Sequence, residues 1–77
     1  MTKTEFIKYF VENGFILKSD FHYIKGDCLV EPSLMRDAWN FRQRYEENKS
    51  KHIGTFKTVK KFLQIYKQTF YVDFNYA

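Results

Sequence analysis

The pattern of apolar and polar positions is most regular between Thr55 and Thr69. At 100° per residue, the apolar side chains of this segment fall on one arc of a helix: Phe56, Val59, Phe62, Leu63 and Tyr66. The rest of the helix surface is polar and carries no carboxylate; it consists of Lys57, Lys60, Lys61, Gln64, Lys67 and Gln68. Solvated helix faces usually mix charges, because opposite charges four residues apart stabilise a helix and like charges destabilise it. The segment therefore predicts an amphipathic helix whose polar face meets an anionic partner.

The start of the chain predicts another helix. Thr2 and Glu5 have the spacing of a capping box, in which each side chain binds the backbone N–H of the other residue. Asn13-Gly14 is a typical stop, because glycine accepts the left-handed conformation that ends many helices. We expect this helix over about residues 3–13.

A hairpin is predicted next. The runs 21–25 and 28–31 flank Gly26-Asp27, a two-residue loop of the kind that joins antiparallel strands. This register places Tyr23 opposite Val30, Ile24 opposite Leu29, and His22 opposite Glu31. The apolar run 15–17 either extends the first strand or covers the core, and the pattern leaves both open.

Residues 33–48 have helical spacing. Ser33 follows Pro32 and suits an N-cap, and the apolar side chains of the segment fall within about 60° of one another; they are Leu34, Ala38, Phe41 and Tyr45. Met35 and Trp39 lie off this stripe, with Arg42 between them. Trp39 and Arg42 are three residues apart and are predicted to stack as a surface patch, unless Trp39 belongs to the core.

The remaining segments complete the expected fold. Residues 49–54 are predicted to form a basic turn, and the alternation over 69–76 predicts a terminal strand that pairs with the hairpin. The predicted order is α-β-β-α-α-β, an α+β fold of three helices on a small three-stranded sheet. Its open edge is a candidate site for homodimer formation.

Composition limits the classes of function. The 77 residues suit one domain, 1–77, and carry a net charge of +4. Residues 33–69 hold nine cationic side chains against three carboxylates, a net +6, so the positive charge belongs to one segment.

We expect no signal peptide and no membrane span, and the single cysteine favours a reducing cytoplasm. The scattered Cys28, His22 and His52 predict no metal site, and no cofactor motif or catalytic constellation is present, so we expect a protein that is not an enzyme.

Two resemblances in the predicted organisation support nucleic-acid binding. A helix, a turn and a lysine-rich second helix resemble a helix-turn-helix. The element order also resembles the type II KH fold of RNA-binding proteins, with Ile53-Gly54 at the first glycine of their GxxG loop. Lys57 stands where the second glycine of that loop would be.

The sequence therefore leaves two functional hypotheses. The first is DNA binding, or service as an accessory subunit of a replication or transcription complex, with contacts to the nucleic-acid backbone. The expected binding residues are Lys49, Lys51, Lys57, Lys60, Lys61, Gln64, Lys67, Gln68, Arg42 and Trp39. The second is a regulator that captures an acidic protein surface through aromatic anchors, with Tyr9, Trp39, Tyr71 and Tyr76 as candidates. The Lys-, Phe- and Tyr-rich composition is similar to that of small proteins from phages and mobile elements, many of which act in this way.

Overall fold

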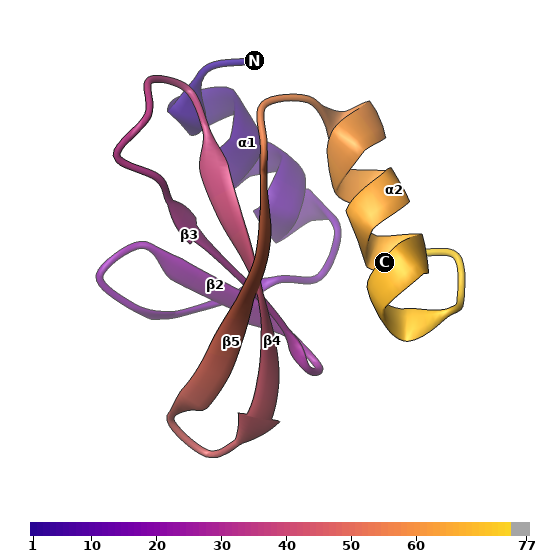
Figure 1. Ribbon diagram of the computed structural model, residues 1–77. Coiled ribbons are helices and arrows are strands. Elements are labelled where there is room, and N and C mark those ends of the chain that lie inside the picture. Colours follow the sequence, from indigo (N-terminus) through magenta and orange to yellow (C-terminus); the bar gives the residue numbers. More distant parts are fainter. Residues whose placement is uncertain (75–77) are drawn as a thin grey trace.

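One five-stranded antiparallel sheet organises the molecule (Figure 1). The computed structural model describes residues 1–74. Its elements are α1 (Lys3–Glu12), β1 (Ile16–Ser19), β2 (His22–Lys25), β3 (Cys28–Pro32), β4 (Trp39–Glu46), β5 (Lys49–Phe56) and α2 (Val59–Phe70). Each strand pairs with its neighbours in sequence, so β1 and β5 are the two edges of the sheet.

Helix α1 begins and ends as predicted. The Thr2 hydroxyl accepts a hydrogen bond from the Glu5 backbone N–H at 3.2 Å, and Glu5 Oε1 accepts one from the Thr2 N–H at 2.9 Å. These bonds, the one from the Thr2 backbone first, hold the pKa of Glu5 below its ordinary value. Asn13 caps the other end, and Gly14 follows with φ of 89°.

The predicted hairpin is also confirmed. Tyr23 lies opposite Val30 and Ile24 opposite Leu29, so β2 and β3 have the expected register. The open question about residues 15–17 has a mixed answer. Phe15 is buried in the core, whereas the strand β1 begins at Ile16 and adds a further antiparallel strand to the hairpin.

The helix predicted over residues 33–48 is wrong. Ser33 does accept a hydrogen bond from the Met35 backbone N–H at 3.1 Å, as an N-cap would, but only a turn follows. Residues from Trp39 onward form β4, which pairs with β3 on one side and β5 on the other. A helix would have buried Leu34 and Tyr45 beside Phe41, whereas both are largely exposed.

The last two predicted segments also differ. Residues 49–54 belong to the strand β5 and do not form a turn. The predicted strand 69–76 is wrong where the structure describes it: α2 continues to Phe70, Tyr71 ends the helix with φ of 61°, and no strand follows up to residue 74, while residues 75 and 76 lie outside the described chain. The order is thus α-β-β-β-β-β-α, with two helices on five strands and not three helices on three strands. The resemblances to the helix-turn-helix and KH folds depended on the predicted order of elements, so they are wrong as well.

The lysine-rich helix is confirmed with a shifted start. Its N-cap is Thr58, whose hydroxyl accepts a hydrogen bond from the Lys61 N–H at 3.1 Å. The helix α2 buries Phe62 and Ile65. The predicted apolar arc therefore faces the sheet, and the polar arc faces solvent.

An aromatic core joins both helices to one face of the sheet. Phe10 of α1 packs against Trp39 of β4 with ring centroids 5.0 Å apart, and against Phe62 of α2 at 5.8 Å. Phe62 in turn packs against Phe41 of β4 at 5.8 Å. Each aromatic ring removes roughly 150–250 Å² from water, which lets so short a chain assemble a shared core. Within residues 1–74, the opposite face of the sheet carries no helix.

Candidate functional site

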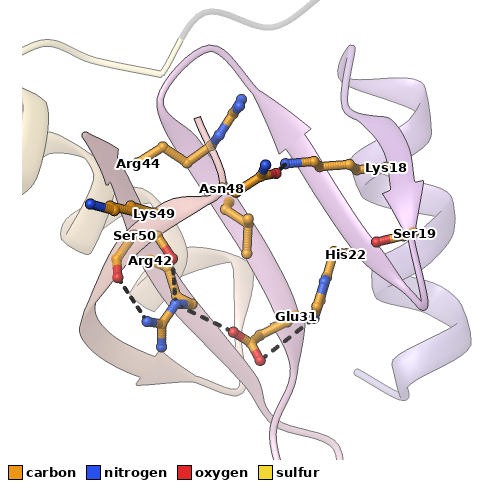
Figure 2. Close-up of a pocket in the computed structure, with 10 residues that line it drawn as sticks. Lys18, Ser19, His22, Glu31, Arg42, Arg44, Asn48, Lys49 and Ser50 are labelled. Carbon is orange, nitrogen blue, oxygen red and sulfur yellow. Dashed lines mark hydrogen bonds and ion pairs between the residues drawn. The ribbon is translucent and has the colours of Figure 1, made fainter. Parts of the chain in front are cut away.

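The uncovered face of the sheet holds a hollow of about 310 Å³, which we call the sheet pocket (Figure 2). Side chains alternate between the two faces of a strand, so the pairing that turns Val30 and Phe41 toward the helices turns Glu31 and Arg42 away from them. The pocket is lined by Lys18, Ser19, His22, Leu29, Glu31, Arg42, Arg44, Asn48, Lys49 and Ser50.

Glu31 lies at the centre of a polar network in this pocket. Its carboxylate lies between Arg42 and His22 (Figure 2), with Nε of Arg42 at 3.5 Å and Nε2 of His22 at 3.8 Å. Arg42 also donates from Nε to Oγ of Ser50 at 2.8 Å and from Nη2 to the Ser50 carbonyl at 3.0 Å. These contacts come from β2, β3, β4 and β5. They fix the guanidinium and offset the charge of the carboxylate.

The rim of the pocket is cationic. Lys18 of β1 donates to Oδ1 of Asn48 at 3.1 Å, which brings the first edge strand against the turn between β4 and β5. Arg44 donates to the Gly26 carbonyl at 3.3 Å. Lys49 pairs with Glu46 at 3.2 Å. The lining holds four cationic side chains and one carboxylate, and the pairing of Glu46 with Lys49 brings the formal charge of the lysines, arginines and carboxylates to +2, obtained as 4 minus 2.

The predicted cations form a second positive surface. Lys49 and Lys51 lie on β5, Lys57 lies in the turn that follows, and Lys60, Lys61 and Lys67 lie on α2. We call the exposed lysines Lys49, Lys51, Lys57, Lys60, Lys61 and Lys67 the lysine band. No aspartate or glutamate occurs between residues 48 and 72, so β5, α2 and the turn between them carry all six lysines without a carboxylate of their own. The predicted Gln64 and Gln68 are exposed on the same helix.

Ion pairing divides the lysine band into two groups. Lys49 pairs with Glu46, and Lys67 pairs with Asp73 at 3.5 Å. Within residues 1–74, the amino groups of the remaining members make no ion pair or hydrogen bond; these are Lys51, Lys57, Lys60 and Lys61. Four cations are thus available to an external anion without breaking a contact.

A groove of about 530 Å³ lies between β5 and α2. Gly54 and Ile65 meet at its base, where a side-chain Cβ on Gly54 would come within 3.4 Å of Ile65 Cδ1. Lys61 and Gln68 line the groove from the helix. The close approach at Gly54 therefore sets two of the predicted residues directly beside the edge strand.

The predicted Trp39 and Arg42 patch is not present. Both residues are in β4, where a separation of three places them on opposite faces of the sheet. Trp39 is 0% exposed, which agrees with the alternative that it belongs to the core. Arg42 joins the sheet pocket. Among the other proposed anchors Tyr71 is 88% exposed, whereas Tyr76 lies outside the described residues.

Several residues of the sheet pocket escaped the sequence reasoning. The predicted hairpin register places His22 opposite Glu31, but it does not bring Arg42 to this pair. The signal for Arg44 was the polar alternation of Asn40, Arg42 and Arg44, which a strand presents on one face and a helix spreads around its axis.

Comparisons of the chain with protein-family models, curated proteins and solved structures found no match. Within residues 1–74, no three His, Cys, Asp or Glu side chains are grouped so as to hold a metal ion. None of the described helices is long and apolar enough to cross a membrane. The functional argument therefore depends on the two positive surfaces.

Proposed function

We propose that this protein binds nucleic acid through the lysine band, with contacts to backbone phosphates. The observation that carries the proposal is the segment 48–72, which supplies six exposed lysines and no carboxylate along an edge strand, the turn after it and the next helix. Amino groups on flexible side chains suit phosphates, and they carry little sequence information. The protein binds the nucleic acid either alone or as an accessory subunit of a larger complex.

The N-terminus of α2 adds support, because its lysines lie where they cost stability. Both helices begin with a threonine N-cap, but the third helical position is Glu5 in α1 and Lys61 in α2. The first turn of α2 contains no acidic residue, although the partial positive charge of a helix N-terminus favours one. A positive charge retained at an unfavourable position is expected where it serves a ligand.

The experiment is fluorescence anisotropy with labelled single- and double-stranded oligonucleotides at two salt concentrations. If four to six lysines meet phosphates of duplex DNA, the plot of log K against log salt has a slope of roughly −4 to −5. Absence of binding at about 50 mM salt would contradict the proposal.

A pair of charge-matched variants locates the surface. Lys60→Gln/Lys61→Gln removes two members of the lysine band, and Lys8→Gln/Arg36→Gln removes two exposed cations elsewhere. Both variants have a net charge of +2, obtained as +4 minus 2. The first should weaken binding and reduce the salt slope by about 2, whereas the second should change binding little. Equal losses would show that net charge alone is responsible.

A protein-binding regulator remains a second candidate, favoured by exposed apolar side chains at the other edge of the sheet. Ile16 and Leu17 of β1 are 69% and 55% exposed, and Phe21 in the following turn is 61% exposed. An edge strand with apolar side chains is suited to pairing with another chain, including a second copy of this one. Sedimentation of the protein alone tests self-association, and capture of host proteins tests binding of another chain. Both should be lost in an Ile16→Lys variant, whereas nucleic-acid binding by this variant should be unchanged.

A further inference from the structure

The sheet pocket has more positive charge than its own carboxylate can balance. Glu31 already contacts both Arg42 and His22, so its charge is shared within the wall of the pocket. The rim cations Lys18 and Arg44 bind neutral oxygens, of Asn48 and Gly26. Their charges are therefore not neutralised by these partners, and the space between them favours an anion.

The pocket also has the donors and the size for a specific small ligand. Ser19, Ser50 and Asn48 bring hydroxyl and amide groups to the same hollow, and Leu29 gives it an apolar contact surface. The volume of about 310 Å³ is at the lower end of ordinary small-molecule sites, which span roughly 300–1,000 Å³. That space admits a phosphate with part of the group that carries it.

We propose that the sheet pocket binds a phosphomonoester. A phosphomonoester carries about −1.5 to −2 at neutral pH and three acceptor oxygens. It therefore matches the formal charge of +2 that remains in the pocket after Glu31 and Glu46 are counted, better than a single carboxylate does. The phosphate is placed between Lys18 and Arg44, whose partners are neutral oxygens, and Arg42, held by Ser50, is the fixed wall behind it.

This site is separate from the proposed function of the lysine band, with which it shares only Lys49. The phosphomonoester is carried either by a free nucleotide or another phosphorylated small molecule, or by the terminal phosphate of a nucleic-acid strand. The two sources present the same chemistry to the pocket, and the probes distinguish them.

The test is an NMR titration of the full chain with inorganic phosphate, a nucleoside 5′-monophosphate and the unphosphorylated nucleoside. We expect the monophosphate to shift the amide signals of His22, Glu31, Arg42 and Ser50, with the nucleoside having no effect. Oligonucleotides with a 5′-phosphate or a 5′-hydroxyl then show whether a strand end also enters the pocket. A preference for the phosphorylated end supports the site with a strand as source, and binding of the monophosphate without that preference supports it with a free ligand.

Matched variants separate the pocket from general charge. Arg44→Gln removes a rim guanidinium and Arg36→Gln removes one from the exposed turn before β4, so both have a net charge of +3, obtained as +4 minus 1. Arg44→Gln should weaken monophosphate binding about tenfold, and Arg36→Gln should leave it unchanged. Lys60→Gln/Lys61→Gln should also leave it unchanged, so failure of one proposal does not imply failure of the other.

Two results would overturn the proposal. One is that neither phosphate, the monophosphate nor the 5′-phosphorylated end shifts the pocket amides at millimolar concentration. The other is that Arg36→Gln weakens binding as much as Arg44→Gln. Circular dichroism of each variant confirms that it is folded, and Arg42→Lys gives an independent check, because it keeps the charge but loses the two-point bond to Ser50.

Discussion

Cys28 shows how far burial changes the chemistry of a single residue. Its side chain is 1% exposed in the core, and this burial raises the pKa of the thiol far above its ordinary value of 9.0, against a small opposing effect of Lys25. The thiol is therefore neutral in the folded protein at pH values where it ionises in the unfolded chain. A buried neutral thiol is also a poor nucleophile, so Cys28 is a packing residue.

This raised pKa predicts a loss of stability at alkaline pH. Above pH 9 the unfolded state releases the Cys28 proton and the folded state retains it, so the free energy of unfolding falls as pH rises. We expect a decrease of about 1.4 kcal/mol between pH 8 and pH 10, measured by urea unfolding. The pKa of Tyr66 is raised from 10.0, mainly by burial, so its contribution begins at the top of this window.

Cys28→Ala is the control for this prediction. The variant should be less stable throughout but should show a smaller decline between pH 8 and pH 10. An equal decline in both proteins would assign the effect to other groups.

Trp39 and Arg42 show why the site was only partly predictable at residue scale. Trp39 is buried in the core, which was the alternative to a surface patch, and Arg42 lines the sheet pocket. Their relation depended on the secondary structure, because a separation of three places two side chains near one another on a helix and on opposite faces in a strand. The exposed lysines of α2 were predictable because their helical period was correct.

At the scale of the elements, the segment 33–48 shows how two periodicities compete. Leu34, Ala38, Phe41 and Tyr45 repeat with helical spacing, whereas Trp39 and Phe41 alternate with polar neighbours as in a strand. No β-branched residue occurs there, so local propensity also favoured a helix. Pairing with both β3 and β5 decided the outcome, and such long-range pairing is not visible in the local pattern.

The β2–β3 and β4–β5 hairpins differ in how clearly the sequence marks them. Gly26-Asp27 is a strong turn signal and gave the correct register of β2 and β3. The turn between β4 and β5 contains Asn48 with φ of 62°, a conformation that asparagine tolerates. A single Asn in the sequence is not enough to predict such a turn. Missing this turn hid the sheet pocket, since its walls come from strands on both sides of it.

At the start of α2, we expect a substitution that stabilises the helix to weaken oligonucleotide binding. Lys61→Glu places a carboxylate three residues after the Thr58 N-cap, which completes the capping box already present in α1. The free energy of unfolding should rise by about 0.5–1 kcal/mol, because the carboxylate also meets the positive end of the helix. Oligonucleotide affinity at low salt should fall in the same variant, measured by anisotropy.

Lys67→Glu is the matched control at the other end of the helix. It makes the same change in charge, but it places a carboxylate in the last turn and removes the pair with Asp73. We expect this variant to lose both binding and stability. If Lys61→Glu were destabilised as well, the argument that Lys61 is retained for a ligand would lose its basis.

At the scale of the whole molecule, the residues that pack the core and the residues of the two positive surfaces lie in different places. Both helices cover one face of the sheet, and the described core contains no buried charged residue. The polar network of Glu31 is on the face without helices, and the lysine band follows one edge strand onto the outer side of α2. Substitutions in either positive surface can therefore test ligand binding without opening the core.

The same arrangement predicts that the molecule unfolds in one step. Phe10 contacts Trp39 and also Phe62, so α1, β4 and α2 share one set of aromatic contacts and neither helix has a core of its own. Urea unfolding followed by helical circular dichroism and by fluorescence of the single Trp39 should give coincident midpoints. Phe10→Leu should lower both midpoints together, by about 1–2 kcal/mol in the free energy of unfolding. Loss of helical signal before any change in Trp39 fluorescence would show instead that a helix detaches while the sheet persists, and that the shared aromatic contacts do not couple the two layers.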